Sequence, residues 1–524
     1  MAQKLKEAAD KLKTSDHPVL DAVIVGTGFA GLGMGIRLKQ AGIHSFVILE
    51  QADGVGGTWR DNHYPGAACD VQSHLYSFSF ERNPNWSRMY GLQSEILGYL
   101  NHCTDKYDLR SHIHFNNSVN SAIFDERSGL WHVTSANGNS FKCRSLINGS
   151  GGLSRPVLPD IPGLKKFKGK MFHSARWDHS YDLKDKTVGV IGTGASAIQI
   201  VPAIQPNVKK LHLFQRTAPW VIAKPDRAIS GAERWLFRVF PPAQWLFRLA
   251  IYWMLEFRVI AFTIHPSLMK LFEVFARGYL KKQIKNPELR QKVTPNFTIG
   301  CKRVLISNEY YGALQKPNVI VNTTAIQEVR ENGIVTKDGV EHPIDALILA
   351  TGFQAAEAMS PFEVKGLNGN DLNDAWANGA EAYLGTTVAG FPNFFLIVGP
   401  NTGLGHSSMV LMIESQINYV LQCILSMRKK KLKFINVLKQ AQDKYNQAIQ
   451  ARLEKSIWNT GGCVSWYRTS SGKNTTLWPG FTFEFRLKTK FVNLSHYEAT
   501  KADDQLESIG LISRIAMLFS GVFR

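Results

Sequence analysis

The sequence lacks a CxxC motif and any long unbroken apolar run. Its six cysteines are scattered and none belongs to a CxxC motif, which argues against a zinc ribbon and a redox-active disulfide. The N-terminus, MAQKLKEAADKLKTS, has no apolar run, so we expect no signal peptide. No stretch reaches the roughly 18 consecutive apolar residues that a membrane-spanning helix requires. A reducing cytoplasm is therefore the expected location.

Acidic residues are also scarce relative to basic ones. The chain has 61 Lys and Arg against 42 Asp and Glu, a formal net charge of +19. This surplus permits attraction to nucleic acid, anionic membrane or phosphorylated ligands, and a basic solvated surface explains it equally well. With 524 residues, of which 44% are hydrophobic, we expect two or three globular domains. No nucleic-acid partner and no metal site are predicted.

Residues 21–50, DAVIVGTGFAGLGMGIRLKQAGIHSFVILE, predict a strand, a helix and a second strand. The residues from 21 to 26 read as a buried strand, and helical spacing continues to Ala41. The second strand is expected over 45–49, with Glu50 at its end. This order of elements is typical of a dinucleotide-binding unit.

The turn between that strand and helix is rich in small residues. Gly26, Gly28 and Gly31 have the spacing GxGxxG, which lets the backbone approach a pyrophosphate at the helix N-terminus. Glu50 can accept hydrogen bonds from ribose hydroxyls. The first unit therefore suits a nucleotide with free ribose hydroxyls.

A second copy of the motif follows a strand expected over 187–191. Its small residues, in the spacing GxGxxA, are Gly192, Gly194 and Ala197. The next strand, 210–214, leads to Arg216 and Thr217 instead of an acid. A carboxylate there would repel a 2′-phosphate, whereas an arginine attracts one, so we predict an NADP site. The alternative is an ordinary surface arginine.

The segment Phe167 to Asp178, FKGKMFHSARWD, carries a specific resemblance. It fits the pattern FxGxxxHxxxWD at every defined position and resembles the type I Baeyer–Villiger monooxygenases. The related N- and S-oxygenating flavin monooxygenases lack the tryptophan. In the family, this His and Trp are linked to coupling between domain movement and catalysis. The resemblance thus implies that His173 and Trp177 are conformational control residues. Without it, a lone histidine here is more often structural.

Residues 56–80, GGTWRDNHYPGAACDVQSHLYSFSF, resemble the flavin-embracing loop of the same family. The resemblance implies that Gly57, Thr58 and Trp59 lie along FAD and that Asp70 lies near the reactive ring. By composition alone the segment is an aromatic, turn-rich loop.

A Lys–Arg pair and a late tryptophan extend the resemblance. Lys302 and Arg303 precede Tyr310-Tyr311, which implies that Arg303 is the catalytic group beside the flavin and that Lys302 helps to bind the NADP 2′-phosphate. Trp466, in the stretch VSWY, resembles a tryptophan that contacts NADP. The alternatives are a solvated basic pair and a core aromatic.

The activity implied by the resemblance is oxidation of a ketone to an ester or lactone with NADPH and O2. NADPH reduces FAD, a C4a-peroxyflavin forms and attacks the ketone, and a tetrahedral adduct rearranges. We expect Arg303 to stabilise the negative charge and Asp70 to hold Arg303. The open alternatives are an N- or S-oxygenase, an NADPH-dependent flavin reductase, and a flavoprotein that only binds a membrane or protein.

The predicted fold class is α/β, with two Rossmann-like dinucleotide-binding domains, for FAD and NADP, and a helical insertion in the NADP domain. Two strand–glycine segments, 146–152 and 346–353, suit close approach to a cofactor or a crossover between domains. The predicted parts are the FAD-binding domain (1–150 and 386–500), the NADP-binding domain (151–225 and 301–385), the insertion (226–300) and a C-terminal basic-apolar tail (501–524).

Within the insertion, residues 231–283 combine aromatic, apolar and basic side chains. One interpretation is a set of helices packed on the NADP unit. The other is a face that contacts anionic membrane, where a lipophilic ketone could enter. Glu256 and Arg258 interrupt the apolar residues, which argues against a membrane span. The oligomeric state and the identity of the ketone do not follow from the sequence.

Overall fold

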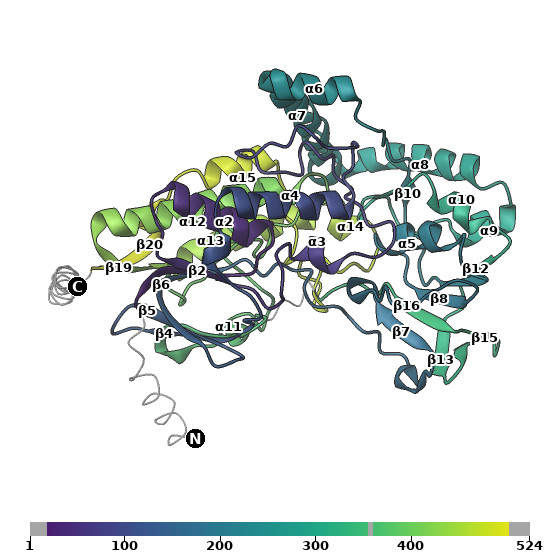
Figure 1. The fold of residues 1–524 in the computed structure, drawn as a ribbon, viewed down its shortest axis with the longest axis horizontal. Coiled ribbons are helices and arrows are strands. Elements are labelled where there is room, and N and C mark those ends of the chain that lie inside the picture. Colours follow the sequence, from purple (N-terminus) through teal and green to yellow (C-terminus); the bar gives the residue numbers. More distant parts are fainter. Residues whose placement is uncertain (1–17, 355–359, 502–524) are drawn as a thin grey trace, which may run out of the picture.

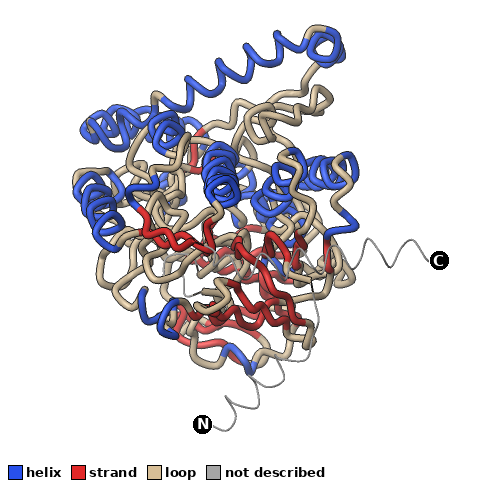
Figure 2. The backbone as a smooth tube through the Cα atoms, turned by 90° about the vertical axis from the view of Figure 1, so that its left-hand side faces the viewer, coloured by secondary structure: helices blue, strands red, loops and turns tan. Residues whose placement is uncertain are grey.

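The structure is a computed structural model that describes residues 18–354 and 360–501. The predicted C-terminal tail lies outside these residues, apart from Lys501. Figure 1 shows two units of strands and helices side by side, with further helices above them. In Figure 2 the strands gather in the lower half of the molecule and helices lie above them.

The first unit is built on an eight-stranded sheet. Its order is β17-β4-β5-β6-β1-β2-β3, and β18 pairs with β6. β1 pairs in parallel with both β2 and β6 and is buried on both sides, as its apolar sequence predicts. The strands are β1 (Leu20–Val25), β2 (Phe46–Leu49), β3 (Ile113–His114), β4 (Val119–Asp125), β5 (Leu130–Ser135), β6 (Ser140–Asn148), β17 (Glu363–Lys365) and β18 (Phe394–Leu396).

Helices α2 (Phe29–Gln40) and α12 (Met409–Lys430) belong to one core with this sheet. α12 is long and apolar enough to cross a membrane, but 61% of its most apolar stretch is buried inside the protein. It carries buried polar side chains, among them Gln416, which donates to the carbonyl oxygen of Gly385 at 2.8 Å. The placement of α12 is therefore that of a core helix.

The second unit is a five-stranded parallel sheet in the order β12-β9-β8-β16-β7. Its strands are β7 (Lys170–His173), β8 (Thr187–Ile191), β9 (Lys210–Phe214), β12 (Val319–Asn322) and β16 (Ala346–Leu349). The predicted strands 187–191 and 210–214 are confirmed residue for residue. Helices α5 (Ala197–Ile204) and α10 (Tyr310–Leu314) pack in the same core. The two Rossmann-like units of the predicted α/β class are thus present.

One predicted boundary lies too late in the chain. The sequence predicts that the NADP-binding domain continues to residue 385. Yet β17 pairs in parallel with β4, with Val364 opposite Ala122, so the chain has returned to the first sheet by residue 363. β17 has only three residues, too few to show a period that sequence reasoning could read.

The helical insertion leaves and rejoins the second unit at one place. β10 (Val221–Ile222) pairs in parallel with β11 (Leu305–Ile306), and most of the chain between them is helical. The helices are α6 (Gly231–Val239), α7 (Pro241–Glu256), η4 (Ile260–Ile264), η5 (Pro266–Leu268), α8 (Met269–Gln283) and α9 (Pro287–Lys292). In Figure 1, α6 and α7 rise at the top of the molecule.

Besides short 3-10 helices, the remaining described elements are two small antiparallel sheets and six further α-helices. Hairpin strands β13 (Ile326–Arg330), β14 (Gly333–Thr336) and β15 (Glu341–Pro343) form a small sheet, and β19 (Leu432–Val437) pairs with β20 (Tyr497–Lys501). The other α-helices are α3 (Thr58–Asp61), α4 (Gln93–Lys106), α11 (Leu372–Ala375), α13 (Lys439–Glu454), α14 (Ile457–Thr460) and α15 (Thr482–Lys488).

The two chain segments that cross between the units run side by side. Val157 donates its backbone N–H to the carbonyl of Gly352 at 2.9 Å, and Gln354 donates to Arg155 at 3.0 Å. The predicted strand–glycine segments end at these crossings, since β6 precedes the first and β16 precedes the second. The described crossings therefore form a paired, hinge-like connection.

Candidate functional site

The first glycine-rich turn brings three backbone segments within contact distance. Gly26 has φ +93°, and a Cβ on Gly31 would lie 1.8 Å from the carbonyl oxygen of Gly26. A Cβ on Gly57 would lie 3.1 Å from Cα of Gly28. Side chains are thus excluded where the turn meets the N-terminus of α2, and this bare backbone with its free N–H groups fits a dinucleotide pyrophosphate.

Glu50 lies buried at the carboxyl end of β2, beside this turn. Its Oε2 accepts hydrogen bonds from the backbone N–H (2.9 Å) and Oγ1 (2.6 Å) of Thr27, and its Oε1 accepts from Ala52 at 3.0 Å. Arg60 lies 3.0 Å from Oε1. These contacts orient the carboxylate at the end of β2, beside the glycine-rich turn, where a ribose hydroxyl of a bound dinucleotide is expected.

The predicted flavin loop begins in a backbone conformation that favours glycine. Gly57 has φ +50° and precedes α3, in which Thr58 is exposed. Trp59 donates its indole N–H to the hydroxyl of Tyr76 at 3.2 Å, which ties the start of the loop to its later part. The loop therefore has a fixed shape next to Gly28.

Arg303 and Asp70 form a two-pronged ion pair. Arg303 Nε donates to Oδ2 of Asp70 at 2.6 Å, and Nη2 donates to Oδ1 at 2.7 Å. The side chains are 32% and 30% exposed. Burial alone would raise the pKa of Asp70, but the charge and hydrogen bonds of Arg303 outweigh it and hold that pKa below its usual range. The charge of Asp70 raises the pKa of Arg303. Both groups therefore remain charged.

Sequence reasoning missed two aromatic neighbours of this pair. Tyr467 is buried next to Arg303, and burial raises the pKa of its phenol to about 12. His406 is buried in the 403–408 turn, just after Leu404, whose carbonyl oxygen accepts from Arg303 Nη1 at 3.4 Å. Neither ring nitrogen of His406 has a hydrogen-bond partner among the described residues. No spacing rule links either residue to position 303, so only the fold brings them there.

His406 also faces a buried carboxylate from the insertion. Its Nε2 lies 3.9 Å from Oε2 of Glu256, and both side chains are fully buried. Burial lowers the pKa of His406, which favours the neutral ring. Glu256 was noted in the sequence only as an interruption of an apolar run. Its position in α7 connects the insertion to the surroundings of Arg303.

The second glycine-rich turn is also shaped for close approach. Gly192 has φ +114°, and a Cβ there would lie 2.3 Å from the carbonyl oxygen of Ala350, whereas a Cβ on Gly194 would meet open space. Ala197 is the first residue of α5. Thr193 donates its hydroxyl to the carbonyl of Thr217 at 2.9 Å, which fixes the two loops beside each other. This turn fits a second dinucleotide.

Two cations from distant parts of the chain meet at this second turn. Burial, and then the positive charge of Arg216, lower the pKa of Lys302. The ammonium of Lys302 also lies 5.1 Å from the centre of the Phe297 ring. The effect of Arg216 on Lys302 places two positive charges near each other, and such a pair is suited to a phosphate group.

His173 is held by both of its ring nitrogens. Nδ1 accepts from the backbone N–H of Ala175 at 3.1 Å, so Nε2 carries the proton and donates to the carbonyl of Gly352 at 3.1 Å. Burial lowers the pKa of His173. Trp177 is buried against Phe172, with ring centres 4.9 Å apart. His173 thus fastens β7 to the crossing segment at Gly352.

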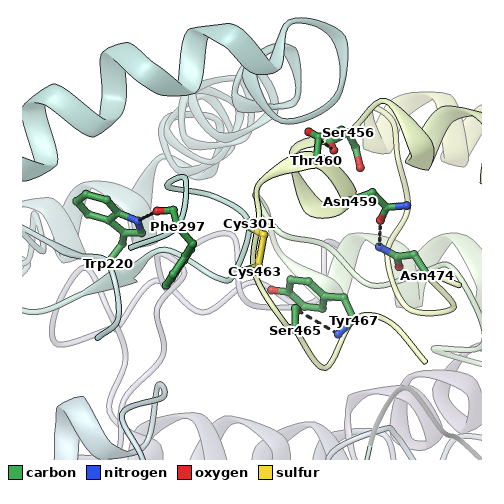
Figure 3. Close-up of a disulfide and its surroundings, with 10 residues drawn as sticks. All are labelled: Trp220, Phe297, Cys301, Ser456, Asn459, Thr460, Cys463, Ser465, Tyr467 and Asn474. Carbon is green, nitrogen blue, oxygen red and sulfur yellow. Dashed lines mark hydrogen bonds between the residues drawn. A yellow bond between two sulfur atoms is a disulfide. The ribbon is translucent and has the colours of Figure 1, made fainter. Parts of the chain in front are cut away.

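A disulfide joins the Lys302–Arg303 loop to the loop that contains Trp466. Cys301 is bonded to Cys463, 162 residues later (Figure 3). Trp466 is 50% exposed, and its ring centre lies 4.6 Å from that of Tyr467. This bond could not be predicted from the sequence, because the two cysteines are far apart in the chain and belong to no motif.

Known proteins resemble this chain over most of its length. A family model described as pyridine nucleotide-disulphide oxidoreductase matches residues 23–233. Baeyer–Villiger monooxygenases of Pseudomonas aeruginosa and Streptomyces coelicolor are 53% identical over 478 residues and 47% identical over 494, covering 91% and 93% of both chains. The solved structure of cyclohexanone monooxygenase from Rhodococcus sp. Phi1 bound to NADP+ has a TM-score of 0.85 at 30% identity, covering 93% of this chain and 100% of that one.

The two relatives match more than nine tenths of this chain at about half identity, so the similarity reaches beyond a shared fold. The two bare glycine turns are in accord with the two cofactors, FAD and NADP, that are bound in solved structures similar to this chain. The chain belongs to the Baeyer–Villiger monooxygenases and is an FAD-dependent, NADPH-using flavoprotein that employs O2 to convert ketones to esters or lactones.

Proposed function

We propose that the ion pair of Arg303 and Asp70 is the catalytic centre of this ketone oxidation. The observation that carries the proposal is the two-pronged contact of 2.6 and 2.7 Å in a partly buried site. When bound, the flavin supplies hydride acceptance from NADPH and activation of O2. The protein must then stabilise negative charge on oxygen, which a fixed guanidinium does well.

The pairing leaves part of Arg303 available to an anion. A guanidinium has five N–H donors, and Asp70 uses one on Nε and one on Nη2. The remaining donors on Nη1 and Nη2 can point at a developing oxyanion, with one long contact to Leu404 as the competitor. Because Asp70 raises the pKa of Arg303, we infer that the cation neither loses its proton nor donates it to the oxygen.

For the cofactors, we assign one set of residues to each. FAD lies along the first turn and the loop that follows it, at Gly26, Gly28, Gly31, Glu50, Gly57, Thr58 and Trp59. NADP lies along the second turn, at Gly192, Gly194, Ala197, Thr217 and Trp466. Arg216 and Lys302 bind its 2′-phosphate, which the lowered pKa of Lys302 beside Arg216 supports.

His173 and Trp177 serve conformational control. The hydrogen bond from His173 to Gly352 at 3.1 Å connects the second sheet to a segment that crosses between the two units. A rearrangement of the units would pull on this contact, so His173 is suited to report domain position to the site.

The substrate we propose is a lipophilic ketone, and the location is the cytoplasm with peripheral contact to a membrane through residues 231–283. The exposed aromatic residues of that insertion support this, among them Trp235 and Phe257.

The catalytic assignment is tested with Arg303→Ala in the FAD-loaded enzyme. We expect NADPH to reduce the flavin at a rate close to that of the unchanged protein, while ester formation falls by on the order of 10²–10³. Arg330→Ala is a matched control, since Arg330 pairs with Glu328 on the exposed hairpin. Ester formation at the unchanged rate in Arg303→Ala would refute the assignment.

A further inference from the structure

The outward face of α7 is apolar along its whole length. Its exposed large side chains are Trp245, Leu246, Trp253 and Met254, and exposed Phe257 follows its last residue. At about 100° of rotation per residue, these positions fall on one side of a helix. A helix that faces water normally presents charged or polar residues on this side. This face therefore has the composition of a surface that is covered by an apolar partner and not by water.

The polar residues of the same helix point into the protein. Gln244 donates to the carbonyl of Asn83 at 2.8 Å, and Arg248 donates to the carbonyl of Ser77 at 3.1 Å. Glu256 accepts from the hydroxyl of Thr482 at 2.9 Å. α7 thus buries its polar side chains together with Ile251 and Leu255, and its outward side carries apolar side chains. These bonds also keep one side of α7 on the protein, so the helix does not span a bilayer.

Neighbouring helices extend the apolar surface. α6 adds exposed Trp235, Phe240 between α6 and α7 is also exposed, and α8 adds Phe272 and Phe275. Figure 1 shows α15, α7, α6 and α8 along the upper side of the molecule. α7 with η4, and η5 with α8, form a pair that is apolar enough for a membrane but bent by 110°. We call the exposed side chains of α6, α7 and α8 the insertion face.

Basic side chains accompany the insertion face. Exposed cations on α6 and α8 are Arg238, Lys270, Lys281 and Lys282. The carboxylates of these three helices are neutralised or buried: Glu233 pairs with Arg227, Glu273 pairs with Arg277, and Glu256 is internal. The face therefore combines aromatic rings with uncompensated positive charge, the combination found on helices that lie in the headgroup region of a membrane.

We propose that the insertion face docks in the plane of an anionic lipid surface, with the rings of α7 among the acyl chains and the lysines of α8 at the phosphates. The charge argues against a second copy of this chain as the occupant. A two-fold contact would place the basic residues of one face against those of the other, which is unfavourable. Lipid phosphates are complementary to them.

The inner side of α7 is close to the catalytic pair. Glu256 lies 3.9 Å from His406, and the charge of Arg303 contributes to the lowered pKa of His406. A ketone dissolved in the bilayer would thus meet the protein beside the helix that borders the site. Docking of the insertion face rests on the proposed membrane contact of residues 231–283 and is independent of the role of Arg303.

The test is co-sedimentation of the FAD-loaded full chain with vesicles. We expect binding to vesicles that mix phosphatidylcholine with phosphatidylglycerol and little binding to phosphatidylcholine alone. The triple variant Trp245→Ser, Trp253→Ser and Phe257→Ser should lower the bound fraction about tenfold, because it removes rings that are exposed in the protein and leaves the core intact. Equal binding of the variant, or equal binding to both vesicle types, would overturn the proposal.

A matched control replaces exposed apolar residues elsewhere, with Ile123→Ser, Val340→Ser and Leu438→Ser. This control should bind vesicles as the unchanged protein does. Arg303→Ala should also bind them, so that a failed catalytic assignment and a failed membrane assignment give different results. Light scattering of the unchanged protein without lipid completes the test: a dimer that the α7 triple variant converts to a monomer, without vesicle binding, would assign the face to self-association instead.

Discussion

Arg303 donates two hydrogen bonds, of 2.6 and 2.7 Å, to the carboxylate of Asp70, which lies 233 residues earlier in the chain. Asp70 lies in the loop that follows α3, and Arg303 lies where the insertion rejoins the second unit at β11. The pair therefore exists only when both units are assembled around it. This makes the position of the cation a property of the tertiary structure and links it to the arrangement of the two units.

Replacing Asp70 by asparagine should disturb the orientation of Arg303 and leave its charge. The amide accepts one hydrogen bond where the carboxylate accepts two, so the guanidinium gains freedom. Loss of such an orienting partner typically costs about 10–100-fold in activity. We expect ester formation to fall by that factor while hydrogen peroxide per NADPH rises. Asp338→Asn, at an exposed turn, should change neither quantity.

Arg216→Ala and Lys302→Ala should weaken NADPH binding without affecting NADH. Each cation is expected to contribute a charge-assisted hydrogen bond to the 2′-phosphate, worth about 1.5–3 kcal/mol. The KM for NADPH should therefore rise on the order of 10–100-fold in either variant. NADH lacks the phosphate and serves as the internal control. A parallel rise for both nucleotides would mean that these residues support the fold of the turn and do not read the phosphate.

His173→Ala should uncouple NADPH consumption from product formation. The change removes the hydrogen bond to Gly352 and the acceptor for Ala175, so the second sheet loses its tie to the crossing segment. We expect flavin reduction to proceed and the ratio of ester to NADPH to fall several-fold. His179→Ala, at an exposed position nearby, is the control. If His173→Ala still formed one ester per NADPH consumed, the proposed role of His173 in conformational control would be wrong.

The disulfide should contribute measurably to stability. A cross-link between residues 162 apart lowers the conformational entropy of the unfolded chain. In the chain-entropy model this raises the free energy of unfolding by at most about 5 kcal/mol. We expect the double variant Cys301→Ser, Cys463→Ser to unfold at a lower temperature than the oxidised protein. Dithiothreitol should lower the unfolding temperature of the oxidised protein and leave that of the variant unchanged. Disulfides are rare in reducing compartments, so mass spectrometry of alkylated cell extracts should accompany the melt. Six free thiols there would show that the bond does not form in the cell.

Acid should destabilise the protein from about pH 6.5 downwards. Burial, assisted by Arg248, lowers the pKa of His74 to about 4, and burial, assisted by His342, lowers that of His212 to about 4. Below pH 6.5 these histidines bind protons in the unfolded chain but stay neutral in the folded protein. The free energy of unfolding therefore falls with decreasing pH until about pH 4. The loss approaches about 1.4 kcal/mol per pH unit for each histidine.

The variant His74→Gln isolates one of these contributions. Its unfolding midpoint in urea, measured between pH 6.5 and 4.5, should fall less steeply than that of the unchanged protein. An identical slope would mean that His74 is not held neutral in the folded state.

Much of the fold followed from local patterns. The predicted strands 187–191 and 210–214 match β8 and β9. The predicted strands 21–26 and 45–49 match β1 and β2 to within one residue at each end, because apolar runs between glycine turns can be recognised without a partner strand. The return to the first sheet at β17 was placed too late, since three residues carry no period.

The sequence by itself determined the two nucleotide turns, the contrast between Glu50 and Arg216 at their strand ends, and the family motif around His173. Glycine spacing and strand-end charge act over a few neighbouring residues, so they are visible in one dimension. Only the tertiary structure decided that Cys301 meets Cys463, that His406 lies buried beside Glu256, and that α7 turns its polar side inward. These are contacts between segments far apart in the chain, and packing selects them where no local pattern records them.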